Sequence, residues 1–253
     1  MAVMTRIALI TGANRGIGRA TALQLARDGV DVIVTYRSHA EEAARVVEEI
    51  TALGRTAVAL PLDVADSSSF DAFADAVRAA LPAFGRETFD HLVNNAGFSR
   101  GGTIADVTEA DVDALIGVHF KGVLFLTQKL LPLLADGGSI VNLSSGLARF
   151  TGPQRAAYGA VKGAVEVLTR YMAAELGPRA ITANVIAPGP VATDFSGGLV
   201  RDNAEVREHL VAMTPLGRYA VAEDIGGAIA ALLAPENRWV TGQRIEVAGG
   251  IHL

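Results

Sequence analysis

Short apolar runs that alternate with helix-forming segments constrain the fold of this chain more than any other feature. The apolar runs lie at 7–10, 32–35, 57–60, 92–93, 140–143, 181–186 and 244–247. Helical patterns fill the intervals, in one segment through Arg27 and in others at 40–53, 66–80, 108–134, 156–176 and 221–233. Strands that are apolar throughout are typical of a parallel sheet with helices on both faces. With no linker, repeat or low-complexity tract in sight, we predict one α/β domain over residues 1–253, built on a doubly wound parallel sheet.

Half of the residues are hydrophobic, but no apolar run is long enough to span a bilayer. The most apolar stretch, 118–134, is interrupted by Lys121, Gln128 and Lys129, and we interpret it as a buried helix. The first strand begins near Arg6, which leaves no room for a signal peptide ahead of it. We therefore expect a cytoplasmic protein with no membrane partner.

The composition also argues against several kinds of site. Cysteine is absent, which removes disulfides, thiolate metal sites and cysteine nucleophiles. The five histidines are scattered without metal-ligand spacing, so we expect no metal centre. The net charge is −5 and no cluster of Lys and Arg stands out, whereas nucleic-acid binding favours a basic stripe. We expect no nucleic-acid partner.

Three glycines, Gly12, Gly16 and Gly18, lie between the first predicted strand and the first helix. Glycine permits a tight turn and lets a diphosphate approach the backbone, and the helix that follows offers free N–H groups and a positive dipole end. The spacing G-x-x-x-G-x-G differs from the commoner G-x-G-x-x-G, although the physical logic is the same. The alternative is a turn that only connects strand to helix. Three glycines within seven residues favour a dinucleotide site.

The residues after the second strand indicate which dinucleotide binds. An NAD site usually places Asp or Glu there, to bind the ribose 2′-hydroxyl. Here the strand ends in Tyr36, Arg37 and Ser38, and Arg15 lies inside the glycine turn. Two guanidinium groups near one ribose suit a 2′-phosphate. We predict NADP(H) in preference to NAD(H); the alternative is that both arginines are simply solvated.

A tyrosine and a lysine four residues apart, Tyr158 and Lys162, project from one face of a predicted helix. A neighbouring ammonium group favours the phenolate and lowers the tyrosine pKa, so that Tyr158 can exchange a proton with a substrate oxygen as hydride moves. Ser145 follows the fifth strand, at the edge where open α/β sheets bind ligands, and its hydroxyl can hold that oxygen. Alone, the pattern Tyr-x-x-x-Lys carries little information.

Taken together, these motifs resemble the short-chain dehydrogenase/reductase family over essentially the whole chain, with the 3-oxoacyl-carrier-protein reductases and glucose dehydrogenases as the nearest subgroups. Besides the glycine turn, Ser145 and the Tyr158–Lys162 pair, the matching pieces are Asp63-Val64, Asn94-Asn95-Ala96-Gly97 and Pro188-Gly189 leading to Thr193. The resemblance implies a Rossmann-type sheet of about seven strands in the order 3-2-1-4-5-6-7. It also implies a homotetramer.

The resemblance implies a role for each matching position. The cofactor phosphates and adenosine ribose would lie against Gly12, Asn14, Arg15, Gly16, Ile17 and Gly18. The rest of the cofactor would contact Asp63, Val64, Asn94, Ala96, Gly97, Pro188, Gly189, Val191 and Thr193. Lys162 would bind the nicotinamide ribose as well as tune Tyr158.

One position departs from the family pattern. Relatives usually carry an asparagine that holds a water in a proton relay to the lysine, and His119 takes its place here. A neutral imidazole can also hold a water through one nitrogen, which would put a titratable group in the relay and make activity change near neutral pH. The alternative is that His119 packs in the helix core. Both interpretations stay open.

The substrate side is less defined. Residues 194–215 would form a lid in this family, hinged at Gly197 and Gly198. Residues 98–103 and 146–155 would form the other walls, and their mixed character suits a moderately polar carbonyl compound or alcohol. An acidic carrier protein needs a basic docking patch, and the residues around Asp136 are acidic, so we lean away from 3-oxoacyl-carrier-protein reduction without excluding it.

Two other function classes fit the sequence less well. A dinucleotide sensor or structural subunit would have lost Ser145, Tyr158 or Lys162, and all three are present. An epimerase or dehydratase on a related fold usually carries a longer C-terminal substrate domain than the residues after Gly189 provide. The prediction is a carbonyl reductase or alcohol dehydrogenase, an enzyme that transfers hydride between a nicotinamide and a carbonyl or secondary alcohol.

Overall fold

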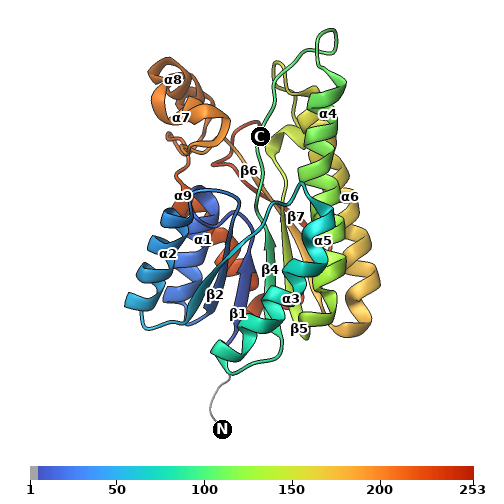
Figure 1. Ribbon diagram of the computed structural model, residues 1–253. Coiled ribbons are helices and arrows are strands. Elements are labelled where there is room, and N and C mark those ends of the chain that lie inside the picture. Colours follow the sequence, from blue (N-terminus) through green and yellow to red (C-terminus); the bar gives the residue numbers. More distant parts are fainter. Residues whose placement is uncertain (1–4) are drawn as a thin grey trace.

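A computed structural model describes residues 5–253 and shows one seven-stranded parallel sheet in the order β3-β2-β1-β4-β5-β6-β7 (Figure 1). The strands are β1 (Ile7–Ile10), β2 (Asp31–Tyr36), β3 (Ala57–Pro61), β4 (Phe89–Asn94), β5 (Leu134–Leu143), β6 (Thr182–Pro188) and β7 (Arg244–Val247). Every neighbouring pair is parallel. The predicted Rossmann-type strand order is confirmed.

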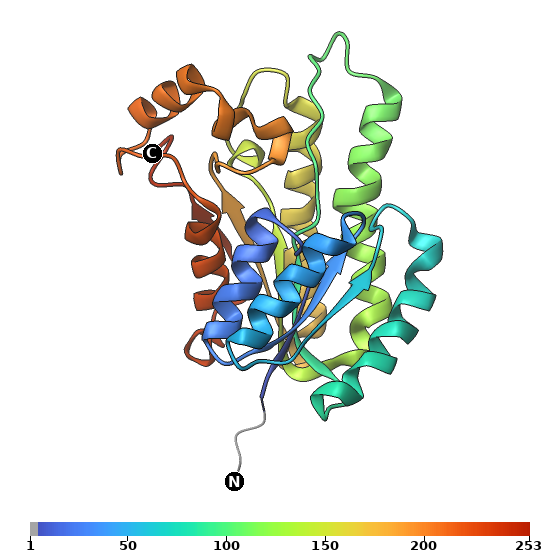
Figure 2. The same ribbon diagram turned by 60° about the vertical axis from the view of Figure 1, so that its left-hand side comes forward.

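Helices cover both faces of the sheet because successive strand residues point to opposite sides. Ala8 and Ile10 pack under α1 (Gly16–Arg27), α2 (Ala40–Ala52) and α9 (Ala222–Leu233), whereas Ile7 and Leu9 pack under α3 (Phe70–Ala80), α5 (Val123–Leu130) and α6 (Ala156–Leu176). Figures 1 and 2 show these two helical layers with the sheet between them. Two short helices, α7 (Leu199–Asp202) and α8 (Ala204–Met213), stand apart from the layers, above the edge where the strands end (Figure 1).

The predicted helix 108–134 is less regular than expected. It consists of α4 (Glu109–Ile116), a π-helical turn at Gly117–Gly122, α5, and a 3-10 turn at Leu131–Leu133. The prediction that it continues through Leu134 is wrong by one residue, because Leu134 pairs with Phe89 and opens β5. The stretch Glu109–Leu133 is long and apolar enough to cross a membrane by length and composition alone. Here its buried side is part of the core beneath it.

Strands β4 and β5 are longer than their apolar runs. The sequence predicts the fourth strand at Leu92-Val93 with the asparagines that follow, and the fifth at 140–143. Both predictions begin too late, since β4 spans Phe89–Asn94 and β5 spans Leu134–Leu143. The first half of β5 contains Asp136 and two glycines, so no apolar pattern marks it. In this half, Leu134 pairs with Phe89 of β4, and a register shift between Phe89 and His91 separates this pair from the regular pairing that begins at Ser139.

Candidate active site

The glycine turn between β1 and α1 requires glycine for steric reasons. Gly12 and Gly16 have φ angles of +64° and +56°, a region that other residues rarely adopt. A Cβ atom on Gly18 would lie 2.4 Å from the Gly12 carbonyl oxygen and 2.6 Å from the Asn95 amide nitrogen. At Gly18 the backbone therefore lies so close to Gly12 and Asn95 that any residue with a side chain would clash with them.

The N-terminus of α1 is left open. Arg15 occupies the N-cap position in an extended conformation and makes no capping hydrogen bond with its side chain. The first N–H groups of the helix thus keep the capacity to bind an anion. This arrangement fits a dinucleotide diphosphate, with the backbone of Gly16, Ile17 and Gly18 as the cradle.

Asn95 braces the turn, a role that the sequence did not indicate. Its side-chain amide donates to the carbonyl oxygens of Thr11 (2.8 Å) and Gly12 (3.1 Å). The buried Thr11 hydroxyl accepts hydrogen bonds from the backbone N–H groups of Asn95 and Ala96, both at 2.9 Å. The loops after β1 and β4 are locked together, although they lie more than eighty residues apart in the chain.

The side chain of Asn94 points away from the predicted cofactor site. It is buried, and its amide donates to Asn142 (2.8 Å) and Thr127 (3.2 Å) between β4, β5 and α5. We expect Asn94 to line the ribose side of the cofactor, and with its side chain held by Asn142 and Thr127, its backbone is the part left for that role. Both partners come from segments distant in sequence.

The residues predicted to select the cofactor lie at the surface after β2. Tyr36 is half-buried, and Arg37 and Ser38 are exposed. Asn14 donates a 2.7 Å hydrogen bond to the carboxylate of Glu42 at the start of α2. The guanidinium of Arg15 lies 3.6 Å from the carboxylate of Asp194, the residue that opens the segment leading to α7.

The remaining predicted cofactor residues lie on two loops. After β3, Asp63 accepts a 2.9 Å hydrogen bond from the backbone of Ala65, and the carbonyl of Val64 packs against Gly122 of the π-helical turn. After β6, Gly189 packs against Ala248, and Val191 pairs with Ala220 through a parallel bridge. The side chain of Thr193 sits beside Gly16, so the loop after β6 reaches the glycine turn.

Ser145, Tyr158 and Lys162 come together beyond the end of β5. Tyr158 and Lys162 lie one turn apart on α6, both buried, with the Lys162 ammonium nitrogen 5.7 Å from the centre of the tyrosine ring. The Ser145 side chain lies close enough to the Tyr158 hydroxyl to lower the pKa of that tyrosine. Lys162 Nζ donates a 2.6 Å hydrogen bond to the carbonyl of Leu143, the last residue of β5. Strand and helix thus fix all three side chains.

Burial dominates the protonation of this group. Burial raises the pKa of Tyr158 above its ordinary value of 10, and the Ser145 side chain offsets only part of that rise. Burial also lowers the pKa of Lys162 to about 7. The sequence predicts that the Lys162 ammonium lowers the pKa of Tyr158. It does not, because burial makes Lys162 itself lose its proton more easily.

His119 lies in the π-helical turn beside the tyrosine. Its Nε2 is 2.7 Å from the carbonyl oxygen of Phe98, a distance that assigns the ring proton to Nε2. Its Nδ1 is buried and has no hydrogen-bond partner within the described residues, and the ring meets Tyr158 edge-on at 5.5 Å. Burial, aided by the charge of Lys162, lowers the pKa of His119 well below 6.5, so the ring is neutral at pH 7.

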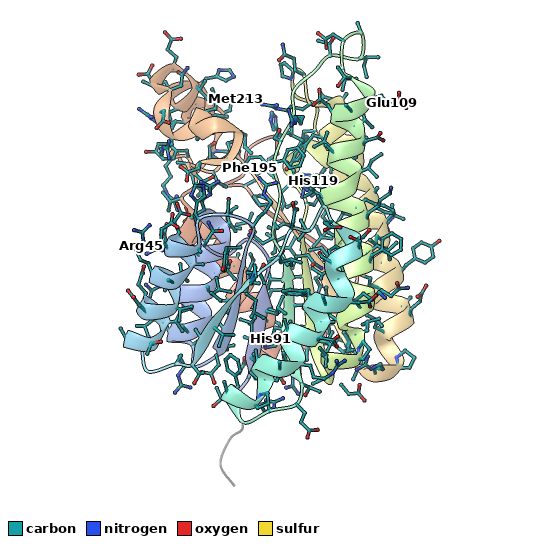
Figure 3. The ribbon with its side chains drawn as sticks, in the orientation of Figure 1. Arg45, His91, Glu109, His119, Phe195 and Met213 are labelled. Carbon is teal, nitrogen blue, oxygen red and sulfur yellow. The ribbon has the colours of Figure 1, made fainter. Side chains whose placement is uncertain are left out.

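The rings of Phe98, His119, Tyr158 and Phe195 form a row in this order, each beside the next. Phe98 lies 5.7 Å from His119, and Phe195 lies 6.2 Å from Tyr158 on the opposite side. In Figure 3, Phe195 projects from the segment below α7 and α8 toward His119 on the facing helix. Phe195 is 42% exposed, so one wall beside the tyrosine is apolar and open to an incoming molecule.

Comparison with known proteins places the chain in a family. A protein-family model described as enoyl-(acyl carrier protein) reductase matches residues 12–252. The chain belongs to the short-chain dehydrogenase/reductase family. It is an oxidoreductase of that family, which includes enzymes acting on carbonyl and hydroxyl groups. The resemblance drawn from the motifs is confirmed.

Three similar proteins illustrate the range of the family around this chain. An uncharacterised oxidoreductase of Methylorubrum extorquens is 40% identical over 246 residues, covering 97% of each chain. The 3-oxoacyl-(acyl-carrier-protein) reductase FabG of Staphylococcus aureus is 38% identical over 252 residues, covering 99% of each. The solved structure of the angucycline C-6 ketoreductase LanV with bound NADP is 36% identical with a TM-score of 0.92, covering 98% of this chain and 96% of LanV.

Proposed function

We propose that this member of the short-chain dehydrogenase/reductase family is an NADP(H)-dependent reductase of ketones, reversible toward the secondary alcohols, with Tyr158 as the general acid and base. The observation that carries this proposal is the meeting of Ser145, Tyr158 and Lys162 beyond β5, on the same sheet edge as the open N-terminus of α1. When bound, the nicotinamide cofactor supplies the hydride.

The protein's own residues handle the proton and the substrate oxygen. The Ser145 hydroxyl would hold that oxygen beside Tyr158, and Tyr158 Oη would donate its proton as the oxygen gains negative charge. Burial keeps Tyr158 protonated at neutral pH, so its hydroxyl carries the proton that reduction of a ketone consumes. Lys162 would hold the cofactor ribose and, in its protonated form, return a proton to Tyr158; its pKa of about 7 leaves both forms present near neutral pH.

His119 would contribute to the path behind Lys162. Its Nε2–H is engaged with Phe98, which leaves Nδ1 as a buried acceptor without a partner. Such a nitrogen suits a water molecule or a hydroxyl donor. We favour this relay role over simple core packing, because the unpartnered nitrogen belongs to a ring that contacts Tyr158 edge-on.

We propose a preference for NADP(H) over NAD(H) because of the positive side chains near the expected position of the adenosine ribose. Arg15 and Arg37 are exposed, and within the described residues the turn after β2 places no carboxylate at the strand end itself. Glu42 is near but is hydrogen-bonded to Asn14. The bound NADP of LanV supports the proposal. We expect kcat/KM to be higher with NADPH than with NADH. Arg37→Ala should reduce the ratio of the two kcat/KM values at least tenfold.

The apolar row of Phe98 and Phe195 favours ring ketones as substrates. A flat ring gains more contact with aromatic walls than a flexible chain does, and loses less conformational entropy on binding. The similarity to an angucycline ketoreductase is consistent with this. The second candidate, reduction of 3-oxoacyl groups on a carrier protein, rests on the 38% identity with FabG.

Three further properties complete the proposal. Residues 194–215, which include α7 and α8, would act as the substrate lid of the single domain. The chain would work in the cytoplasm, without a membrane or nucleic-acid partner. It would assemble as a homotetramer, supported by exposed apolar side chains on α5, on α6 and before β7, namely Phe125, Val167, Tyr171 and Trp239.

The test is NADPH oxidation with a panel of cyclic ketones, open-chain ketones and 3-oxoacyl thioesters. Tyr158→Phe should lower kcat by a factor of about 10² to 10⁴, because it removes the proton donor. Tyr171→Phe, at an exposed tyrosine on the same helix, is the matched control and should leave kcat unchanged. Cofactor binding without turnover of any ketone would instead indicate a sensor.

A further inference from the structure

Arg244, the first residue of β7, lies beside the segment that carries Ser145. Its guanidinium reaches three acceptors: Nε donates to Glu166 Oε1 at 2.7 Å, Nη1 to Glu246 Oε2 at 3.2 Å, and Nη2 to the backbone carbonyl of Ser145 at 3.3 Å. The arginine side chain is only 20% exposed, and that of Glu166 only 14%. A shielded charge with this many partners is strongly held in one geometry.

Glu166 ties the same segment from the other side. It follows Lys162 by one turn on α6, and its Oε1 also accepts a 2.7 Å hydrogen bond from the Ser144 hydroxyl. The backbone N–H of Ser144 donates to the carbonyl of Ile186 in β6 at 2.8 Å. Both serines after β5 are therefore anchored through the Arg244–Glu166 pair.

The backbone of Ser145 determines where its hydroxyl points. Ser145 Oγ accepts a 3.2 Å hydrogen bond from the N–H of Leu147, and the Ser145 carbonyl accepts one from Ala148 at 3.0 Å. These local bonds define a short turn, but they do not fix the turn to the rest of the molecule. Arg244 ties the turn to β7, because it binds the same carbonyl from that strand, and Arg149 adds a 3.3 Å contact from the turn to Glu246 of β7.

We propose that Arg244 is a positioning residue, which acts through Glu166 and the Ser145 carbonyl to hold the Ser145 hydroxyl against Tyr158. This inference rests on the proposed role of Ser145 in binding the substrate oxygen. Arginine suits the task because its planar group carries five donors and serves three acceptors at once. A lysine has three donors on one atom and cannot span the two carboxylates and the carbonyl together.

Arg86 provides a matched control at the opposite end of the strands. Its side chain is 13% exposed, donates to the Thr5 carbonyl at 2.8 Å and pairs with Asp90 at 3.1 Å, so it makes the same kinds of contact far from Ser145. Arg244→Met should lower kcat about tenfold or more, with KM for NADPH within about twofold, since small displacements of a catalytic group are costly. Arg86→Met should leave kcat unchanged. Arg244→Lys should keep the fold and show an intermediate kcat.

A double-mutant cycle tests the route through Ser145. In the Ser145→Ala background, Arg244→Met should change the single-turnover rate of hydride transfer by less than about twofold, because the group it positions is already gone. Equal fold-losses in both backgrounds would overturn the inference, as would a normal kcat in both Arg244 variants.

Amide hydrogen exchange separates this inference from the proposed function. The peptide spanning 144–150 should exchange faster in Arg244→Met than in the unmodified chain, and at the unmodified rate in Arg86→Met. If no ketone is reduced by the unmodified chain, the proposed function fails while this measurement still reports on Arg244. Unchanged exchange at 144–150 would refute the anchoring by Arg244 whatever the activity.

Discussion

His119 shows how much a single side chain depends on its neighbours. Gly97 makes room for it, since a Cβ atom there would lie 2.5 Å from the imidazole Cε1. The carbonyl of Phe98 selects the tautomer, and Lys162 together with burial keeps the ring neutral. The expectation of a change in activity near neutral pH is thereby revised, because the ring titrates well below pH 6.5.

The relay role of His119 predicts a specific pH profile. Protonation at low pH would remove the Nδ1 lone pair, so the unmodified enzyme should lose kcat on the acid side. His119→Asn keeps an acceptor that does not titrate, and should retain kcat at acid pH where the unmodified enzyme loses it. His119→Leu should lower kcat about tenfold or more at all pH values. Measuring kcat from pH 9 down to the acid limit of the folded protein checks this, with Lys162, whose pKa is about 7, titrating in both enzymes. Superimposable profiles for the unmodified enzyme and His119→Asn would count against the relay.

At the scale of elements, the packing of α9 on α1 depends on one glycine. A Cβ atom on Gly226 would lie 2.8 Å from backbone atoms of Ala20 and Thr21, whereas one on the adjacent Gly227 would meet nothing within 4 Å. Gly226→Ala should therefore destabilise the fold by about 1–3 kcal/mol through overpacking. Gly227→Ala should stabilise it by up to about 1 kcal/mol through helix propensity. Urea unfolding of the two variants checks the pair, and an equal effect on both would contradict the close approach.

Strand β4 carries a second testable feature, the buried His91. Neither ring nitrogen has a hydrogen-bond partner in the described residues, and burial lowers the pKa of His91 to about 4. Between pH 6.5 and pH 4 the unfolded chain therefore binds a proton that the folded chain does not, so stability falls as the pH falls through that window. The loss should approach about 3 kcal/mol near pH 4.

Urea unfolding at pH 7.5 and pH 4.5 measures the effect of His91. His91→Leu should flatten the dependence of stability on pH over this range, because it removes the titrating group. His209→Gln, at an exposed position, should leave the dependence as it is. If His91→Leu and the unmodified chain lose equal stability on acidification, the assignment is wrong.

The sequence predicted those elements whose pattern is local. The strands and the helices that pack on the sheet are predictable because their own residues show the pattern, and the Tyr158–Lys162 pair because four residues make one helical turn. Helices α7 and α8, which stand apart from the layers, lie in a stretch that the sequence predicts to be irregular. The first half of β5 was not visible, since pairing with β4 rather than its own residues makes it a strand. Likewise, the positions of the Asn94, Asn95 and Arg244 side chains depend on partners that lie 33 to 99 residues away in the chain.

At the scale of the whole molecule, the exposed apolar side chains of Phe125, Val167, Tyr171 and Trp239 predict that several copies of the chain assemble. Trp239 is 98% exposed in the single chain and is its sole tryptophan. A homotetramer that covers this surface should give a light-scattering mass near four times 26.3 kDa. Its tryptophan emission should move to longer wavelength when dilution releases single chains. Trp239→Ser should weaken assembly, whereas Leu53→Ser, at an exposed leucine outside this surface, should not. A monomer at micromolar concentration would contradict the prediction.

The hydrogen bonds that join Thr11 to Asn95 and Ala96 have a consequence for synthesis. The turn after β1 leaves the ribosome early, yet its hydroxyl acceptor stays unpaired until the loop after β4 has been made and β4 has paired with β1. Contacts of such long sequence separation form late in folding. A nascent chain that ends before β4 therefore carries the whole glycine motif without the shape that binds a dinucleotide, and the nucleotide gives no stability to the chain until the centre of the sheet is complete.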